Sequence, residues 1–293
     1  MKANLLIDAR NRLGEGIQWN AAHRRVWWTD IMGRMLWSCD ADGGAVETLA
    51  TPSRLGCFAF DPDNRILAAF EDGVYAWDIE ADRLDLLAPF EPDHPSSRMN
   101  DGRCDRQGRL IAGGIDEESD RATSSVIRYA GEVAETVIAG VNCANGICFS
   151  PDGAWMYFTD SPTRTILRYP YDPETGTMGA GREFHALPSG DGVADGACVD
   201  ADGALWSARW GSGRVQRILP DGSAGMAVTV DAPQVTCACF GGPDLDRLYI
   251  TTAREGMDED ALAAAPLSGG LFVAEPGMRG LPEARFASAL FPG

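Results

Sequence analysis

Short apolar runs and tight polar turns alternate along the whole chain. One unit recurs six times: an apolar stretch, a turn rich in Asp, Gly, Pro or Asn, and a second apolar or aromatic stretch, as in FAFDPDNRIL from residue 58 and ICFSPDGAWMYF from residue 147. Such units predict pairs of β-strands joined by hairpin turns. Their anchors, the last residues before each turn, recur every 41 to 50 residues at Trp19, Phe60, Cys104, Phe149, Val199 and Phe240.

A period of this length, built from short strands, is typical of β-propeller blades, which stack on their neighbours to bury both faces. We therefore predict an all-β chain in which residues 1–293 form a single six-bladed β-propeller domain. We expect residues Asn4 to Asp8 to supply the outer strand that closes the ring against the last blade. The Ala-rich segment 258–266 ends at Pro266 and predicts only a short helix in a loop.

Polar residues recur at one position of this repeat. Four residues before the anchors stand Glu15, Gly56, Asn100, Asn145, Asp195 and Thr236. Equivalent positions of the innermost strands converge at one mouth of a propeller's channel, so four of these six sites would bring Asp, Glu or Asn side chains together. The alternative is the ordinary polarity of turns that precede strands.

Glu15, Asn145 and Asp195 are each followed by glycine, which lets the backbone turn sharply beside the side chain. Two carboxylates and an amide oxygen that meet in a concave site repel one another unless a cation neutralises them. We therefore predict one divalent metal ion in the central channel. Oxygen ligands favour Ca²⁺, Mg²⁺ or Mn²⁺, and Fe²⁺ (Fe(II)) and Zn²⁺ also accept them, so the identity of the metal stays open.

The overall charge limits the partners. The 293 residues carry 25 Lys+Arg and 43 Asp+Glu, a formal charge of −18, which has the wrong sign for binding nucleic acid or an anionic membrane. The first ten residues lack the apolar run of a signal peptide, so we expect a cytoplasmic protein. The oligomeric state is not determined by the sequence.

Two further residue types are expected in the core. Most of the eight cysteines lie among apolar residues and none forms Cys-x-x-Cys, which favours buried, reduced thiols over a disulfide or a thiolate metal site. Trp206 and Trp210 are likewise expected to pack between strands rather than to reach the channel mouth.

Several long segments resemble the regucalcin/gluconolactonase (senescence marker protein) family of six-bladed metal-binding propellers. They are LGEGIQW, RMNDGRCDRQGR, NGICFSPDGAWMYFTDSPTRTI, DGACVDADGALWSARWGSGRV and CFGGPDLDRLYITTAREGMD, and together they span nearly the whole chain. One departure is Ala194, where members of the family usually have proline before the Asp-Gly pair.

The resemblance implies roles for individual residues. Glu15, Asn145 and Asp195 would be the metal ligands, and Arg98, Asn100 and Glu118 would bind substrate. Asp116 and Glu117 are adjacent alternatives to Glu118.

These assignments lead to a hypothesis about function: a lactonase that hydrolyses an aldonolactone (xylono-, arabinono- or gluconolactone) to the open-chain sugar acid. The metal would act as a Lewis acid and Asp195 as the general base. The alternatives are a promiscuous metal-dependent esterase or organophosphate hydrolase, and a non-catalytic calcium-binding propeller.

Overall fold

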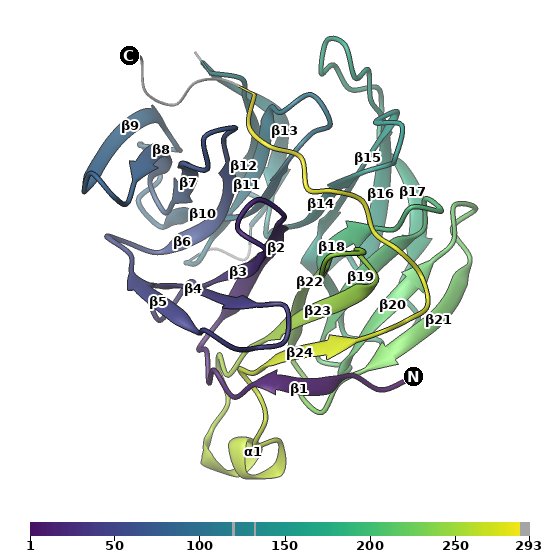
Figure 1. The fold of residues 1–293 in the computed structure, drawn as a ribbon. Coiled ribbons are helices and arrows are strands. Elements are labelled where there is room, and N and C mark those ends of the chain that lie inside the picture. The colour runs from purple at the N-terminus through teal and green to yellow at the C-terminus, as the bar shows by residue number, and fades with distance from the viewer. Residues whose placement is uncertain (119–120, 132, 288–293) are drawn as a thin grey trace.

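The chain forms six four-stranded antiparallel sheets around a common centre, in a computed structural model that describes residues 1–118, 121–131 and 133–287 (Figure 1). The innermost strands contact one another in a ring: β2 (Gly14–Asn20), β6 (Leu55–Phe60), β10 (Ser97–Cys104), β14 (Ala144–Phe149), β18 (Val193–Val199) and β22 (Val235–Gly241). The predicted six-bladed β-propeller is confirmed. Each of the six anchors lies at or near the end of an innermost strand.

The remaining strands follow outward in each blade. The second strands are β3 (Arg25–Asp30), β7 (Ile66–Phe70), β11 (Leu110–Asp116), β15 (Trp155–Asp160), β19 (Leu205–Trp210) and β23 (Arg247–Thr252). The third strands are β4 (Met35–Asp40), β8 (Gly73–Asp78), β12 (Ser124–Tyr129), β16 (Thr165–Pro170), β20 (Arg214–Ile218) and β24 (Leu271–Ala274). The outer strands are β5 (Glu47–Ala50), β9 (Arg83–Pro89), β13 (Ala134–Val141), β17 (Arg182–Ala186), β21 (Ala224–Thr229) and β1 (Asn4–Ile7).

The ring closes through strand β1. This N-terminal strand pairs antiparallel with β24, so that Asn4 lies opposite Val273 and Leu5 opposite Phe272. The sixth blade therefore combines the two ends of the chain, and the closing strand expected at Asn4 to Asp8 is confirmed. Because β1 supplies the fourth strand, β24 is paired on both of its edges.

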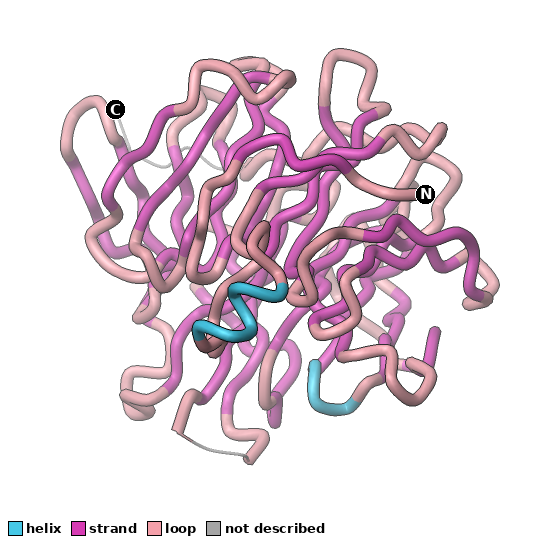
Figure 2. Tube along the Cα trace, turned by 90° about the horizontal axis from the view of Figure 1, so that it is seen from below, coloured by secondary structure: helices cyan, strands magenta, loops and turns pink. Residues whose placement is uncertain are grey.

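Helix is confined, among the described residues, to η1 (Ser161–Thr163) and α1 (Glu259–Ala264), which appear as the two cyan segments in Figure 2. The Asp258 side chain accepts a hydrogen bond from the Ala261 N–H and so caps α1. This is the short helix predicted at residues 258–266. No helix in the described part of the chain is long and apolar enough to span a membrane.

The core consists of six apolar clusters, one between each pair of neighbouring blades. Strand β6 shows how one strand serves two of them: Phe58 and Phe60 pack toward the first blade, whereas Cys57 and Ala59 pack toward the third. Successive side chains of a strand point to opposite faces, so a strand with both faces covered is apolar throughout. This arrangement explains the uninterrupted apolar runs in the sequence.

The cysteines belong to this core. All eight are free, and all except Cys143 are buried. Burial raises the pKa of the Cys39 thiol to about 12, so this thiol stays protonated at neutral pH. The expectation of reduced, buried thiols is confirmed for seven of the eight.

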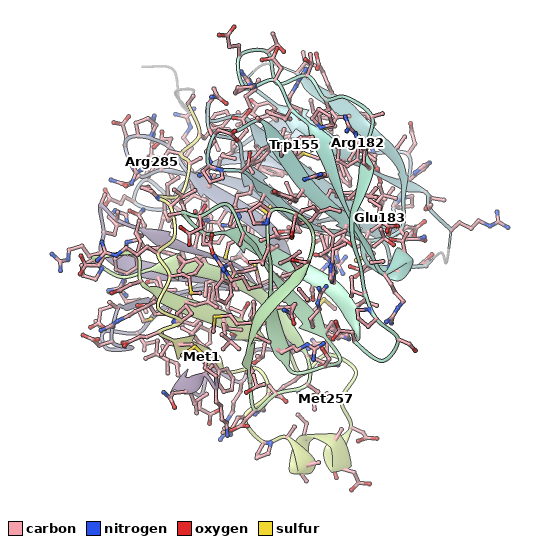
Figure 3. All side chains as sticks on the ribbon, turned by 90° about the vertical axis from the view of Figure 1, so that its right-hand side faces the viewer. Met1, Trp155, Arg182, Glu183, Met257 and Arg285 are labelled. Atoms are coloured by element: carbon pink, nitrogen blue, oxygen red, sulfur yellow. The ribbon has the colours of Figure 1, made fainter. Side chains whose placement is uncertain are left out.

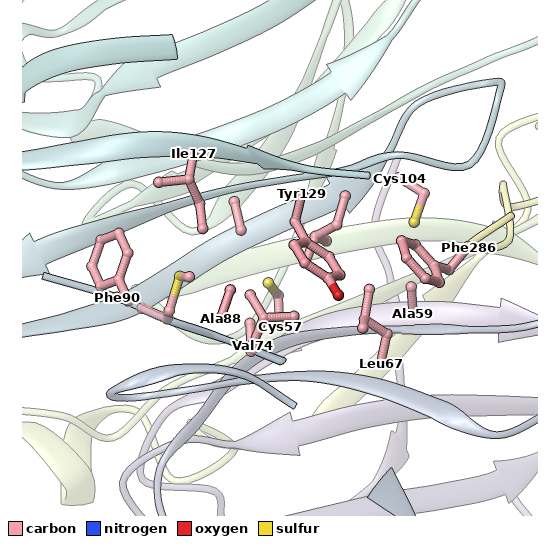
Figure 4. Packing of buried hydrophobic residues seen from close by; sticks show 14 of the residues in the cluster. Cys57, Ala59, Leu67, Val74, Ala88, Phe90, Cys104, Ile127, Tyr129 and Phe286 are labelled. Carbon is pink, nitrogen blue, oxygen red and sulfur yellow. The ribbon is translucent and has the colours of Figure 1, made fainter. Parts of the chain in front are cut away.

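The C-terminal segment 279–287 crosses the end of the propeller where the innermost strands finish, as the yellow trace of Figure 1 shows. Its backbone forms hydrogen bonds with several blades. The Arg279 carbonyl accepts from the Ala201 N–H of the fifth blade, and the Phe286 N–H donates to the Phe60 carbonyl of the second. The Phe286 ring stacks on Tyr129 at 5.8 Å between the second and third blades (Figure 4). Arg285 of the same segment (Figure 3) donates to the Asp61 carbonyl at 2.9 Å.

This segment also closes one end of the channel. The Arg103 guanidinium, on β10, donates to the Glu283 carboxylate at 2.9 Å and lies close enough to donate weakly to the Ile17 carbonyl at 3.4 Å. The Arg103–Glu283 ion pair is largely buried and lies between the ends of the innermost strands and the C-terminal segment. The channel mouth at the opposite end, where the innermost strands begin, carries the candidate site.

Candidate active site

Each innermost strand has an irregularity in register near its beginning. The shift falls between Glu15 and Gln18 in β2, between Asn145 and Cys148 in β14 and between Ala194 and Ala197 in β18, and the other three innermost strands have one at the corresponding place. A β-bulge adds a residue to one strand and redirects a side chain. The bulges therefore explain why the polar residues that precede the anchors leave the alternating pattern of the core.

The glycines after the polar residues permit these bulges. Gly16 and Gly146 have φ angles of 58° and 65°, a conformation that other residues rarely adopt. Gly196 is required for a different reason, because a Cβ atom there would lie 2.5 Å from the Cys237 sulfur. Close approach of β22 thus leaves no room for a side chain beside Asp195.

The channel mouth opens into a cavity of about 560 Å³. Five of the six site residues expected from the sequence line it: Glu15, Arg98, Asn100, Asn145 and Asp195. They come from four different blades, so the ring brings together positions that are up to 180 residues apart in the chain.

Glu118 is the exception. It is exposed, its backbone N–H donates to the Asp116 carboxylate at 3.1 Å, and the cavity is lined by its neighbour Glu117 instead. Strand β11 ends at Asp116, and the Glu117 N–H then bonds to the Ser96 carbonyl, which turns the Glu117 side chain toward Arg98. Glu117 therefore occupies the place in the cavity wall that was expected for Glu118.

Glu15 and Asp195 are buried carboxylates, each only 6% exposed. Within the described residues neither forms a salt bridge; each accepts a hydrogen bond from the N–H of the glycine that follows it, at 3.1 Å. Burial, and then repulsion from Asp195 and Asp101, raises the pKa of Glu15 well above its ordinary value. Burial and Asp101 do the same to the pKa of Asp195. The channel mouth therefore destabilises the charged forms of both carboxylates, which lack a cationic partner there.

The Asn145 amide is held by neighbours on both sides. Its Nδ2 donates to the Ser161 hydroxyl at 2.9 Å, and that hydroxyl donates to the Ala194 carbonyl at 2.7 Å. Its Oδ1 accepts a hydrogen bond from Asn100 Nδ2 at 3.2 Å. The contact with Ser161 defines which end of the amide is nitrogen, and so directs the amide oxygen toward the other polar groups of the cavity.

The residues at the channel mouth fit a divalent cation. Two buried carboxylates without a cationic partner, together with an oriented amide oxygen, form an oxygen donor set that a hard cation would neutralise. No group of three or more His, Cys, Asp or Glu side chains suited to a metal occurs in the described ranges, and the candidate set accordingly contains only two carboxylates.

Arg98 provides the positive charge of the cavity, but its hydrogen bonds go to Glu117, Asn100 and a backbone carbonyl and not to Glu15 or Asp195. It is 4% exposed, and its Nε donates to Glu117 Oε1 at 2.7 Å. Its Nη1 donates to Asn100 Oδ1 at 2.8 Å and to the Met99 carbonyl at 3.0 Å. Arg98, Glu117 and Asn100 thus form one hydrogen-bonded group beside the carboxylates, with donors and acceptors suited to a hydroxylated ligand.

Most of the remaining cavity wall is apolar, and Ser161 and Glu255 are its other polar residues. The apolar lining residues are Leu13, Met32, Ile115, Cys143, Pro162, Val193 and Trp210. The expectation that Trp210 packs in the core was wrong, because the residue stands at the end of β19, where the strand meets the channel mouth. The expectation for Trp206 is confirmed: it is fully buried and packs edge-on against Phe240 at 5.5 Å. Ser161 was not recognised from the sequence, and Glu117 was named only as an alternative to Glu118, since both residues lie outside the repeat.

A six-bladed propeller with buried carboxylates at one channel mouth defines the class of protein. The family described as SMP-30/Gluconolactonase/LRE-like region matches residues 13–254, and the chain belongs to this family. It is 40% identical to the L-arabinolactonase of Azospirillum brasilense, over 98% of this chain and 96% of that one, and 38% identical to the 6-deoxy-6-sulfogluconolactonase of Pseudomonas putida, over 94% and 95%.

A solved structure gives the same result for the fold. The calcium-binding protein regucalcin from Agrobacterium tumefaciens superposes with a TM-score of 0.94 at 33% identity, covering 98% of both chains. The family resemblance noted in the sequence is therefore confirmed by sequence and by structure.

Proposed function

We propose that the protein is a metal-dependent lactonase that hydrolyses an aldonolactone, such as xylono-, arabinono- or gluconolactone, to the open-chain sugar acid. The observation that carries this proposal is the convergence of two buried, unpaired carboxylates with a hydrogen-bonded Arg98, Asn100 and Glu117 group in one cavity. Relatives named as an arabinolactonase and a sulfogluconolactonase, at 40% and 38% identity, support the reaction class. Acid release from purified aldonolactones tests it.

Glu15, Asn145 and Asp195 would hold one divalent ion. When bound there, the ion would supply Lewis-acid polarisation of the lactone carbonyl. Ca²⁺, Mg²⁺, Mn²⁺, Fe²⁺ and Zn²⁺ all accept this donor set, and the similarity to a calcium-binding protein adds weight to Ca²⁺.

The side chains of the cavity would carry out the proton transfers and orient the substrate. Asp195 accepts a proton from water as the water oxygen bonds to the carbonyl carbon. When the ring carbon–oxygen bond breaks, Asp195 returns that proton to the departing ring oxygen, which becomes a hydroxyl group. Arg98 and Asn100 donate to hydroxyl groups of the sugar ring and Glu117 accepts from one, which fixes the carbonyl next to Asp195.

Replacing Asn100 with alanine is expected to raise the Michaelis constant about tenfold and to change kcat less, because one hydrogen bond to a substrate hydroxyl and the support of Arg98 are both lost. Steady-state rates over a range of lactone concentrations measure the two constants separately. A large fall in kcat at an unchanged Michaelis constant would instead place Asn100 in the chemical step.

Replacing Ser161 with alanine is expected to weaken metal binding about 10- to 100-fold, because the amide of Asn145 loses the hydroxyl that orients it. Titration calorimetry with Ca²⁺ and Mn²⁺ measures this affinity without relying on turnover. Thr163→Ala is the matched control, since the Thr163 hydroxyl donates to the backbone carbonyl of Asp160 at 2.7 Å on the exposed side of η1, away from Asn145. Equal affinities for the Ser161→Ala variant and the wild type would contradict the assignment of Asn145 as a ligand.

The apolar wall favours a second candidate, a broader metal-dependent esterase. Trp210, Met32 and Val193 contribute apolar surface to the cavity wall that would suit an uncharged, less hydroxylated ester. An aryl ester in the substrate panel separates the two candidates: higher kcat/KM for the aryl ester than for every aldonolactone would favour the esterase.

A further inference from the structure

Arg54 connects the second blade to the substrate-binding group of the third. It directly precedes β6, and its side chain is 22% exposed. Its Nε donates to Glu71 Oε2 at 2.6 Å, and its Nη1 donates to Glu117 Oε2 at 2.7 Å. Glu71 directly follows β7 in the same blade, so it anchors Arg54 from the side away from Glu117.

The carboxylate of Glu117 is consequently shared between two guanidinium groups. Its Oε1 accepts from Arg98 and its Oε2 from Arg54, both at 2.7 Å. Burial raises the pKa of Glu117, but hydrogen bonds from Arg98 and Arg54 outweigh it and lower this pKa below its ordinary value. Two partners on opposite oxygens determine the plane of the carboxylate, and one partner alone would leave it free to rotate.

The hydrogen bonds continue from Glu117 toward the carboxylates of the channel mouth. Arg98 donates to Asn100 Oδ1 at 2.8 Å, and Asn100 donates to Asn145 Oδ1 at 3.2 Å. A change in the orientation of Glu117 therefore alters the position of Arg98 and, through it, of Asn100. Arg54 itself is not among the residues that line the cavity, so it acts on a ligand only through Glu117.

We propose that Arg54 is a positioning residue for substrate binding, which holds Glu117 so that its free lone pairs and the donors of Arg98 meet the hydroxyl groups of the sugar ring. This inference rests on the proposed lactonase function and assigns to it a residue outside the cavity. Without Arg54, Glu117 turns both oxygens to Arg98, and the guanidinium and the carboxylate satisfy each other instead of the substrate.

A double-mutant cycle tests the inference. The Michaelis constant and kcat for an aldonolactone are measured for wild type, Arg54→Gln, Glu117→Gln and the double variant. Arg54→Gln is expected to raise the Michaelis constant about tenfold with kcat within about twofold of wild type. In the Glu117→Gln background the same replacement is expected to have no further effect, because Arg54 acts through Glu117.

Arg65→Gln is the matched control. Arg65 belongs to the same blade, is 23% exposed and forms an ion pair with Asp61, but it lies at the opposite end of the propeller. The Arg65→Gln variant is expected to have a lower melting temperature and an unchanged Michaelis constant. This control therefore separates an effect on substrate positioning from a general loss of stability. If Arg54→Gln does not fold, Glu71→Gln loosens Arg54 without removing it and is expected to raise the Michaelis constant in the same direction.

The possible results are distinct. An unchanged Michaelis constant in Arg54→Gln, or an equal increase in both backgrounds, overturns the role of Arg54. A wild-type protein without activity on any aldonolactone overturns the proposed function itself, before the variants are compared.

Discussion

Asp195→Ala is expected to reduce turnover at least 1,000-fold, to about the rate of the blank, because one carboxylate would serve both as metal ligand and as general base. Asp195 is suited to both roles: it is buried, its pKa is raised by burial and by Asp101, and its only hydrogen bond in the described structure comes from the Gly196 N–H. Its remaining oxygen is thus available to the cavity. Initial rates of acid release measure the loss.

Asp195→Asn separates the two roles. The amide keeps an oxygen that can bind a cation but cannot accept a proton from water, so this variant is expected to lose turnover while retaining part of its metal affinity. Rates and calorimetric affinities are therefore measured on the same preparations. An Asp195→Ala protein that turns over near the wild-type rate would refute the assignment.

Removal of the metal is expected to destabilise the protein strongly at pH 7 and weakly at pH 5. A ligand present at about 100 times its dissociation constant stabilises a fold by about 2.7 kcal/mol, which corresponds to a fall in Tm of about 5 °C on chelation. Without a cation, burial raises the pKa values of Glu15 and Asp195, and both carboxylates favour the protonated form in the folded state.

The sign of the pH dependence follows from these raised pKa values. The stability that proton binding gives to the metal-free fold is fully present below the unfolded pKa values, about 4, and is lost as the pH rises through the folded ones. A metal ion must displace the same protons, so its stabilising effect increases with pH. Melting curves with and without chelator between pH 5 and pH 8 measure the difference. A chelator effect that is constant or decreases with pH would contradict this account. In Asp195→Asn the rise of the chelator effect with pH should be smaller, because only Glu15 of the two carboxylates remains to be deprotonated.

The repeat made the architecture predictable. Six anchors such as Phe60 and Phe149 mark the ends of innermost strands because a blade buries both faces and its inner strand must be apolar throughout. The polar residues at a constant distance before the anchors, among them Glu15 and Asn145, could be grouped for the same reason. Every innermost strand has a bulge near its beginning. Because the bulge recurs from blade to blade, polar residues, several of them followed by glycine, recur at the same position of the sequence repeat.

Other features left no periodic signal. Glu117 and Glu118 are chemically identical neighbours, and only the turn after β11 decides which one faces Arg98. Trp210 was assigned to the core because an apolar side chain at the end of a strand can pack against a neighbour or line a cavity, and the sequence does not distinguish the two. The segment 279–287 joins several blades through isolated backbone hydrogen bonds, so it lacks the alternation of a strand.

The most direct test of the central claim is acid release from a panel of aldonolactones, before and after chelation and after separate addition of Ca²⁺, Mg²⁺, Mn²⁺, Zn²⁺ and Fe²⁺, with spontaneous hydrolysis subtracted. We expect turnover that chelation abolishes and that at least one ion restores, with the same ions restoring the melting temperature. Turnover that chelation leaves unchanged would contradict the role of the metal, and the absence of turnover with every ion and every lactone would contradict the lactonase itself.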